Sequence, residues 1–428
     1  MSKEKNKEEA LRTPKGMHDI LPEEWRWWDK VNKTTEKVTE FYGFQKIETP
    51  ILEHAGLFAR TVGEDNDIVQ KEMYTVKTKG GDVLAIRPEG TASIARAFLE
   101  HALSKASLLQ KLWYEGPMFR YESPQAGRLR QFHQIGFEVL GGVGDPMYDA
   151  QVIIAMYRLL EDLRIKNVTL RINSIGCKVC RPAYKRQLQN YYKNALKKLC
   201  ADCNKRYKDS PLRLLDCKNE KCQPYKEDAP SFFDKLCSNC STHLKSVLEY
   251  MDELGVPYIL DNQLVRGLDY YSKTVFEFYA EGENSLALGG GGRYDYLIEI
   301  LGGRVTPGVG GAFGVERIIE TMKSQGVNLP ERTPKKVFIV HVGDLAKKKS
   351  LKIIEELRHA NISVTEALSK DSLKAQLKAA DKEGAAIALI LGQKEIFEEN
   401  IIIRDLKNSL QESVPMERMV DEIRKRLK

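Results

Sequence analysis

The most informative stretch of the chain is FRYESPQAGRLRQFHQ, which occupies residues 119–134. Apolar side chains recur on both sides of it, over residues 111–120 and again over 131–140. Each of these segments has the length and composition of a β-strand, and the loop between them is polar. The sequence therefore predicts two neighbouring strands joined by a charged loop.

Four charged side chains lie in or beside this loop: Arg120, Glu122, Arg128 and Arg130. A guanidinium group binds phosphate oxygens through paired hydrogen bonds and also stacks on planar rings. An arginine at a strand end, followed by a glutamate and further arginines, is therefore typical of a site for a polyphosphate and an adjacent base. The alternative is that these charges contact only solvent.

The other segments of residues 12–330 extend this architecture. Helical spacing of apolar residues predicts helices over 23–42, 91–104 and 146–163, and one that begins near 315. Strands or hairpins are predicted over 44–51, 72–86, 168–173, 275–279 and 286–288, with glycine-rich segments at 289–292 and 302–314. Because strand follows strand through polar loops, we expect an α+β fold with a mostly antiparallel sheet flanked by helices.

The C-terminal residues have a different pattern. After a predicted linker at 329–334, apolar strands and amphipathic helices alternate to the end of the chain. This pattern predicts a separate C-terminal α/β domain with a mixed sheet over residues 334–428. The length of 428 residues also fits two or three domains.

Composition excludes several classes of protein. The chain is 30% charged and 42% hydrophobic, and no apolar run approaches the ~20 residues that cross a bilayer. Residues 1–16 are charged and lack the apolar segment of a secretory signal, so we expect a cytoplasmic protein with no membrane partner. Residues 1–11 are expected to form a flexible tail.

All eight cysteines lie between residues 177 and 240, a segment with a formal charge of +8, whereas the rest of the chain sums to −1. They form four pairs: Cys177/Cys180, Cys200/Cys203, Cys217/Cys222 and Cys237/Cys240. Four pairs suffice for two structural Zn²⁺ sites of four thiolates each. We favour nested pairing, in which the outer two pairs form one site and the inner two the other. Consecutive pairing and unligated or redox-active thiols are the alternatives.

The positive charge of the cysteine-rich segment indicates an acidic partner, with nucleic acid the leading candidate.

Five strings in the chain together resemble one family. Residues 119–134 resemble motif 2 of the class II aminoacyl-tRNA synthetases, in the form found in histidyl-tRNA synthetases. Residues 264–271 (LVRGLDYY) and 287–295 (ALGGGGRYD) are similar to the two histidine signatures of that family. Residues 310–317 (GGAFGVER) resemble its motif 3, and residues 13–19 (TPKGMHD) resemble its usual start.

The resemblance implies a domain organisation and an activity. Residues 12–330 would form a class II catalytic core, residues 177–255 a zinc-binding insertion domain within it, and residues 334–428 an anticodon-binding domain. The implied reaction is ATP-dependent activation of L-histidine to histidyl-adenylate, followed by transfer of histidine to the 3′ end of tRNA(His). Mg²⁺ would accompany ATP, and a homodimer would form through motif 1 at residues 44–50.

The resemblance also implies residue roles. Arg120, Arg266 and Arg317 would be catalytic, with Arg266 as the main stabiliser of the transition state between the histidine carboxylate and the α-phosphate. ATP would be bound by Arg120, Glu122, Arg128 and Arg317. Histidine would be bound by Glu89, Thr91, Gln134, Glu138, Arg266, Tyr270, Tyr271 and Tyr294. In this set Glu138 would accept a hydrogen bond from the imidazole ring and Tyr271 would donate one.

Two other functions fit parts of the sequence. A regulatory subunit of ATP phosphoribosyltransferase would share the core, but such chains usually lack the C-terminal domain and the ATP-binding arginines. A zinc-ribbon adaptor for nucleic acid would use the core only as a scaffold. Which residue would read the 5′ end of the tRNA also stays open, with Gln125, Arg128 and Arg130 as candidates.

Overall fold

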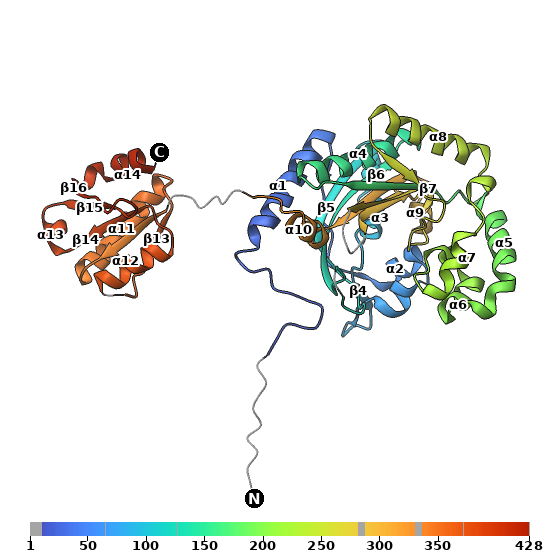
Figure 1. Cartoon of the computed structure of the whole chain (residues 1–428), viewed down its shortest axis with the longest axis horizontal. Helices are drawn as coiled ribbons and strands as arrows, with labels where there is room; N and C mark the ends of the chain where they lie inside the picture. The colour runs from blue at the N-terminus through green and yellow to red at the C-terminus, as the bar shows by residue number, and fades with distance from the viewer. Residues whose placement is uncertain are drawn as a thin grey trace, which may run out of the picture. The chain divides into compact units, whose positions relative to one another are not determined.

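The computed structural model describes residues 11–64, 66–125, 127–280, 287–329, 336–370 and 372–427. The chain separates into two compact units, Met1–Leu329 and Pro330–Lys428 (Figure 1). Almost all of the predicted tail at 1–11 and of the predicted linker at 329–334 lies outside the described residues.

The N-terminal unit is built on an eight-stranded sheet with the order β1-β5-β6-β11-β10-β9-β7-β8. Its strands are β1 (Gln45–Lys46), β5 (Leu109–Phe119), β6 (Gln131–Gly141), β7 (Val168–Ser174), β8 (Tyr258–Leu260), β9 (Ser272–Ala280), β10 (Ala287–Arg293) and β11 (Gly308–Gly314). The pairs β1–β5 and β7–β8 are parallel, and the pairs between the other neighbours are antiparallel. The predicted mostly antiparallel sheet is therefore confirmed, and the loop of residues 119–134 joins two of its central strands.

Four long helices pack on this sheet: α1 (Trp25–Tyr42), α4 (Pro146–Asp162), α8 (Ser238–Glu253) and α10 (Val315–Ser324). Their apolar faces share one core with strand residues, for example Leu159 of α4 with Phe276 of β9. The helix α4 begins where Asp145 accepts a hydrogen bond from the backbone N–H of Met147, an N-cap that fixes its start. The helices α4 and α8 lie side by side (Figure 1).

A three-stranded sheet with the order β2-β4-β3 lies beside the main one. Its strands are β2 (Leu52–His54), β3 (Thr75–Lys77) and β4 (Val83–Ile86), and it is accompanied by α2 (Ala55–Val62), a π-helical turn (Ile68–Glu72), α3 (Thr91–Glu100), a 3-10 turn (Leu103–Lys105) and α9 (Leu297–Ile300). The predicted hairpin over 72–86 is confirmed by the antiparallel pair β3–β4.

Three predicted elements differ in the structure. The strand expected over 44–51, with an interruption at Pro50, is shorter in the structure: β1 covers only Gln45–Lys46, and β2, which begins at Leu52, belongs to another sheet. The helix expected over 91–104 ends at Glu100, because Ala102 takes a left-handed φ of 48° before the 3-10 turn. The strand predicted up to residue 288 is longer, because the glycines 289–292 continue it as β10, which pairs with β9 and β11.

The cysteine-rich segment between β7 and α8 forms helices and turns without any strand, and every residue from 175 to 237 is described. Its elements are α5 (Arg181–Tyr192), α6 (Ala201–Asp209), α7 (Gln223–Glu227) and the 3-10 turns Lys193–Lys198, Pro211–Asp216, Glu220–Cys222 and Phe233–Lys235. The helix α8 joins this segment to the core, since its Cys240 packs with the insertion while Val247 and Met251 lie in the main core.

The C-terminal unit has a five-stranded sheet with the order β13-β12-β14-β15-β16. Its elements are β12 (Val337–His341), α11 (Asp344–His359), β13 (Val364–Glu366), α12 (Leu373–Lys382), β14 (Ile387–Leu391), α13 (Gln393–Phe397), β15 (Asn400–Asp405), β16 (Gln411–Pro415), a 3-10 turn (Met416–Arg418) and α14 (Met419–Leu427). The strands β12, β13 and β14 are parallel and the last two are antiparallel, so the predicted mixed sheet is confirmed. The sequence analysis missed β16, an edge strand in which only Val414 is buried.

Within the described residues, no helix has the length and apolar character that a membrane span requires.

Candidate active site and metal centres

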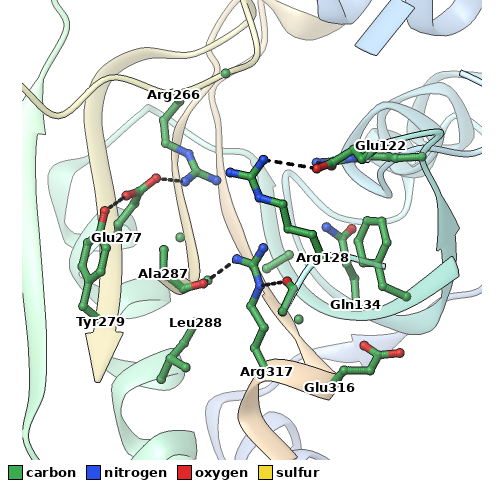
Figure 2. A pocket seen from close by; sticks show the side chains of 18 of the residues that line it. Glu122, Arg128, Gln134, Arg266, Glu277, Tyr279, Ala287, Leu288, Glu316 and Arg317 are labelled. Atoms are coloured by element: carbon green, nitrogen blue, oxygen red, sulfur yellow. Dashed lines mark hydrogen bonds and ion pairs between the residues drawn. The ribbon is translucent and has the colours of Figure 1, made fainter. Parts of the chain in front are cut away.

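A cavity of about 930 Å³ opens where the loop between β5 and β6 faces β9, β10 and the start of α10. Many of the predicted site residues line it, including Arg120, Glu122, Arg128, Gln134, Arg266 and Arg317. In Figure 2, the guanidinium groups of Arg128, Arg266 and Arg317 point into the same space from different elements. The structure thus brings residues from three separate sequence motifs together around one cavity.

The arginines of the loop and of α10 are held by backbone oxygens. Arg120 donates from Nε to the Pro88 carbonyl at 2.9 Å, and its guanidinium lies 5.3 Å from the centre of the Phe132 ring. Arg317 donates from Nε to the Gly127 carbonyl at 2.9 Å and from Nη1 to the Ala287 carbonyl at 2.6 Å (Figure 2). Neutral acceptors fix both side chains without cancelling their charge, which leaves the charge available to an anion.

Burial, together with the nearby Arg128 and Arg120, lowers the pKa of Arg317. Burial is the largest cause, and repulsion by Arg128 and Arg120 adds to it, so a bound polyphosphate would offset that repulsion. Glu122 compensates for part of this charge, since its carboxylate lies 3.9 Å from Nη1 of Arg120 and 3.6 Å from Nη1 of Arg128. The site therefore combines an excess of guanidinium groups with one carboxylate at its edge.

Arg266 lies on the opposite wall and forms an ion pair with Glu277 of β9 (Figure 2). Burial alone would lower the pKa of Arg266, but the Glu277 carboxylate outweighs it and raises that pKa. The hydroxyl of Tyr279 also donates to Glu277, so the carboxylate is itself held in place. The Nε of Arg266 is buried and has no hydrogen-bond partner among the described residues. The arginine is thus positioned but retains an unused donor.

The sequence analysis missed Glu277. Its signal was a single acidic residue between Phe276 and Phe278 in an otherwise apolar strand. Such a residue needs a partner when its strand is buried. The close approach of Arg266 to Glu277 also depends on Gly290, because a Cβ at that position would lie 3.0 Å from Nη1 of Arg266 and 2.8 Å from Cγ of Glu277.

Behind this wall lies a buried polar cluster that contains Glu138. Its carboxylate accepts a hydrogen bond from the hydroxyl of Thr91 at 2.6 Å and another from the hydroxyl of Tyr294. Burial raises the pKa of Glu138 to about 8. Gly310 makes room for it, since a Cβ at that position would lie 1.7 Å from Oε2 of Glu138. The glycines of the motif-3-like string are therefore required by the acid on the neighbouring strand.

Glu89 belongs to the same cluster and caps α3. Its carboxylate accepts hydrogen bonds from the backbone N–H groups of Thr91 at 2.7 Å and Ala92 at 2.8 Å, and the hydroxyl of Tyr270 lies 3.4 Å away. Burial raises the pKa of Glu89, and these backbone donors partly oppose the shift. Glu89 therefore occupies the positive end of the helix dipole of α3.

The sequence analysis also missed Tyr114, a buried residue of β5. It pairs in register with Gly136 of β6, and a Cβ on Gly136 would lie 2.2 Å from the Tyr114 ring. A Cβ on Gly90 would meet the same ring at 2.3 Å. The sequence contains the tyrosine and both glycines, but only the folded structure shows that the ring packs against them.

The predicted histidine-binding residues fall into two groups. Gln134 and Arg266 line the open cavity. Glu89, Thr91, Glu138, Tyr270, Tyr271 and Tyr294 are buried behind it. The groups meet at Tyr271, whose ring centre lies 5.7 Å from the Arg266 guanidinium. The Oε1 of Gln134 is buried without a partner among the described residues, so it is an acceptor available to a ligand.

Arg87, two residues before Glu89, has a structural role. Its guanidinium donates to the Thr49 carbonyl at 2.8 Å and to the Pro117 carbonyl at 3.0 Å, and only 4% of the residue is exposed. It ties the turn before α3 to two neighbouring segments and does not line the cavity.

The eight cysteines form two groups of four. Cys177, Cys180, Cys237 and Cys240 are one group and Cys200, Cys203, Cys217 and Cys222 the other, and the Sγ atoms in each lie within 4.8 Å of one another. The grouping follows the nested pairing rather than the consecutive one.

Individual distances within these groups fit a tetrahedral metal site. Sγ–Sγ distances of 3.7 Å and 3.9 Å occur in the first group and 3.8 Å in the second. Four thiolates at ~2.3 Å from a Zn²⁺ ion would be about 3.8 Å apart.

Backbone donors also favour thiolates in these groups. The N–H of Cys237 donates to Sγ of Cys180 at 3.1 Å, and that of Cys200 donates to Sγ of Cys222 at 3.3 Å. Burial alone would raise the pKa of Cys177, but backbone N–H groups of Cys180 and Val179 outweigh it and bring that pKa to about 7. Burial raises the pKa of the thiols of Cys180, Cys203, Cys222 and Cys240, so a metal ion would displace protons from them on binding.

Comparison with known proteins places this geometry in a family. The profile of the family described as "Histidyl-tRNA synthetase" matches residues 16–318, and that of "Anticodon binding domain" matches residues 336–426.

Relatives match over almost the whole chain. A protein named histidine–tRNA ligase from Dehalococcoides mccartyi is 44% identical over 97% of this chain and 100% of its own length. One with the same name from Desulforamulus reducens is 45% identical over 95% of this chain and 97% of its own length. The crystal structure of apo S. aureus histidyl-tRNA synthetase superimposes with a TM-score of 0.80 at 32% identity, covering 96% of this chain and 99% of the other. The matched residues contain both the cavity with its arginines and the polar cluster around Glu138, and the chain belongs to the histidyl-tRNA synthetase family.

Proposed function

We propose that this protein is a histidine–tRNA ligase: it activates L-histidine with ATP to histidyl-adenylate and transfers the histidine to the 3′ end of tRNA(His). The observation that carries the proposal is the convergence of Arg120, Arg266 and Arg317 on one cavity beside a buried polar cluster. In adenylate formation, the amino-acid carboxylate attacks the α-phosphate and pyrophosphate leaves. The protein's task is to align two anions and to stabilise the charge that develops on phosphorus.

In this proposal, Arg120 and Arg317 bind the triphosphate of ATP, and Glu122 and Arg128 complete the nucleotide site. The backbone contacts of Arg120 and Arg317 support the assignment, because both side chains are fixed before substrate binds and keep their charge. Mg²⁺ enters with ATP and neutralises part of the phosphate charge, and Glu122 offers it a carboxylate.

Arg266 contacts both the carboxylate and the α-phosphate. Its ion pair with Glu277 holds the side chain at one edge. Its unpaired Nε leaves a further donor. A preorganised cation of this kind stabilises a transition state more than a mobile one, because no reorganisation is needed during the reaction.

The polar cluster supplies histidine selectivity. Glu138 accepts a hydrogen bond from the imidazole N–H, and the hydroxyl of Tyr271 donates to the other ring nitrogen. Glu89, Thr91 and Gln134 surround the α-ammonium group, and Tyr270 and Tyr294 complete the walls. In the structure Thr91 and Tyr294 occupy both oxygens of Glu138, so binding requires at least one of these hydrogen bonds to be shared or exchanged.

Each group of four cysteines holds one Zn²⁺. The Sγ spacing and the backbone N–H donors support this, since both match a closed tetrathiolate site. The role is structural, because four protein ligands leave no position for substrate. With residues 177–255 as an insertion domain, the basic segment is braced by metal and contacts tRNA.

The remaining regions take the roles that the family implies. Residues 12–330 act as the class II catalytic core and residues 334–428 bind the anticodon of tRNA(His), in keeping with the matched anticodon-binding profile. A homodimer forms around residues 44–50. Two observations support this dimer contact: β1 is a short strand at the edge of the sheet, and the apolar side chains of Phe41, Ile51 and Leu52 nearby are exposed. The site of action is the cytoplasm.

Histidine-dependent exchange of labelled pyrophosphate into ATP tests the proposal. A regulatory subunit of ATP phosphoribosyltransferase or a zinc-ribbon adaptor would not catalyse this exchange. The presence of all three arginines in one cavity, and of the C-terminal unit, favours the ligase over both.

A further inference from the structure

The second cysteine group lies next to the nucleotide cavity. Its ligands Cys200 and Cys217 line a smaller hollow together with Arg120, Arg128 and Arg317. Lys218 follows Cys217 directly and lines both this hollow and the main cavity. The insertion therefore contributes side chains to the wall that faces the arginines, a contribution that the sequence motifs did not indicate.

The charges around the cavity are unevenly compensated. Seven Lys and Arg side chains and five Asp and Glu side chains line it. Arg128 and Arg266 lie within 4 Å of a carboxylate. In contrast, Lys218, Lys226 and Arg317 form no ion pair within the part of the chain that the structure describes. Asp216 is near enough to attract Lys218, and Glu122 and Glu277 to attract Arg317, but none is within ion-pair distance. The cations without an ion pair therefore come from two sides, with α10 on one and the insertion on the other.

The loop that carries Lys218 is fixed at both ends. Cys217 and Cys222 belong to the same group of four Sγ atoms, so a metal there would close the loop. Just after it, the side chain of Gln223 donates to the Cys217 carbonyl at 2.7 Å, and within it the side chain of Asn219 accepts from the Lys221 N–H at 3.1 Å. The position of Lys218 thus depends on a short, internally hydrogen-bonded segment.

The insertion is also joined to the catalytic residues. Arg206 and Arg213 both pair with Asp67, at 3.2 Å and 3.3 Å. Asp67 precedes the π-helical turn Ile68–Glu72, and the Glu72 carbonyl accepts a hydrogen bond from the Tyr121 N–H beside Arg120. This series of contacts holds the insertion against the loop of residues 119–134.

We propose that Lys218 is an additional phosphate-binding residue, and that the second cysteine group positions it to contact the polyphosphate of ATP opposite Arg120 and Arg317. The proposal rests on the proposed function, since the polyphosphate is that of the activation reaction. The chemistry favours this ligand because the Lys218 ammonium group, which has no carboxylate within ion-pair distance among the described residues, faces a cavity whose other cations are arranged for phosphate. The exposed side chain of Lys218 reaches the ligand without burying its charge.

The test compares full-length Lys218→Ala with Lys221→Ala in pyrophosphate exchange without tRNA. Lys221 lies in the same loop, is exposed, and does not line the cavity, so it controls for loss of charge in the loop. Lys218→Ala should raise the KM for ATP roughly tenfold, the loss expected for one hydrogen bond to a charged group. Lys218→Arg should restore most of the affinity, and Lys221→Ala should match the unsubstituted protein.

A binding measurement makes the result independent of turnover. Calorimetric titration with ATP and Mg²⁺ should show the same roughly tenfold loss for Lys218→Ala. Equal ATP affinity in the two alanine variants would overturn the proposal. Unchanged exchange with slower tRNA charging would also overturn it and would assign Lys218 to phosphates of the RNA. If the proposed function fails instead, the unsubstituted protein itself shows no histidine-dependent exchange.

Discussion

The hydroxyl of Tyr294 donates a hydrogen bond to Glu138, a carboxyl group whose residue has no exposure to solvent. Glu138 lies on β6, and Tyr294 directly follows the last residue of β10. Their contact joins the glycine-rich string around β10 to the strand that follows the charged loop. It is the centre of the cluster to which we assign histidine recognition.

The first prediction concerns pH and Glu138. Burial raises its pKa to about 8 in the folded chain, whereas an unfolded glutamate titrates near ~4.3. The folded state therefore binds this proton more tightly. The stabilisation is complete below the unfolded pKa and is lost as the pH rises through about 8.

Denaturant unfolding at ~pH 5 and ~pH 8 measures this effect. The unsubstituted protein should lose stability relative to Glu138→Gln as the pH rises, because the amide does not titrate. Glu253→Gln, on the exposed end of α8, serves as the control and should follow the unsubstituted protein. A difference in the free energy of unfolding between the unsubstituted protein and Glu138→Gln that stays constant with pH would contradict the account.

The second prediction concerns Arg266. Arg266→Ala should slow adenylate formation by ~10²–10³-fold while histidine binding stays nearly unchanged, because the contact forms mainly in the transition state. Glu277→Gln keeps the shape of the ion-pair partner and should slow the reaction less. Single-turnover kinetics measures the rate of adenylate formation, and a separate titration measures the affinity for histidine. Equal losses in binding and rate would instead make Arg266 a ground-state anchor.

The third prediction concerns the glycine opposite Glu138. A Cβ at Gly310 would lie 1.7 Å from the Glu138 carboxylate, so Gly310→Ala should displace Glu138 and destabilise the fold by about 1–3 kcal/mol. Histidine binding should weaken with it. Gly56→Ala is the matched control, since nothing lies within 4 Å of a Cβ there and alanine favours the helix α2. Equal stability of the two variants in denaturant unfolding would refute the packing argument.

The fourth prediction concerns metal. The protein purified with Zn²⁺ should contain two ions per chain by elemental analysis, and Cys180→Ser or Cys203→Ser should each remove about one. Chelation with Mg²⁺ in excess should reduce tRNA charging more than adenylate formation at saturating ATP. At low ATP the adenylate step should also slow, because the loop carrying Lys218 loses its support. A chain without metal, or with one ion, would refute the two-site assignment.

Much of the site could be predicted from the sequence because its residues lie in contiguous strings. The positions of Arg120 and Arg317 follow from a strand–loop–strand pattern and from a glycine-rich strand that leads into a helix. The nested cysteine grouping could be favoured from spacing alone, although consecutive pairing was not excluded.

The partners that depend on strand register could not be predicted. Glu277 meets Arg266, and Tyr114 faces Gly136, only because particular residues of neighbouring strands lie side by side. The strand predicted over 44–51 is shortened to Gln45–Lys46 for a related reason, since after Pro50 the chain joins a different sheet as β2. The place of Lys218 depends on how the insertion folds back, which no motif records.

The most direct test of the central claim is histidine-dependent exchange of labelled pyrophosphate into ATP by the full-length, zinc-loaded protein. The account predicts exchange with L-histidine, no exchange when other amino acids replace it, and loss of the activity in Arg266→Ala. An absence of exchange with pure, folded protein, or exchange that does not depend on histidine, would contradict it.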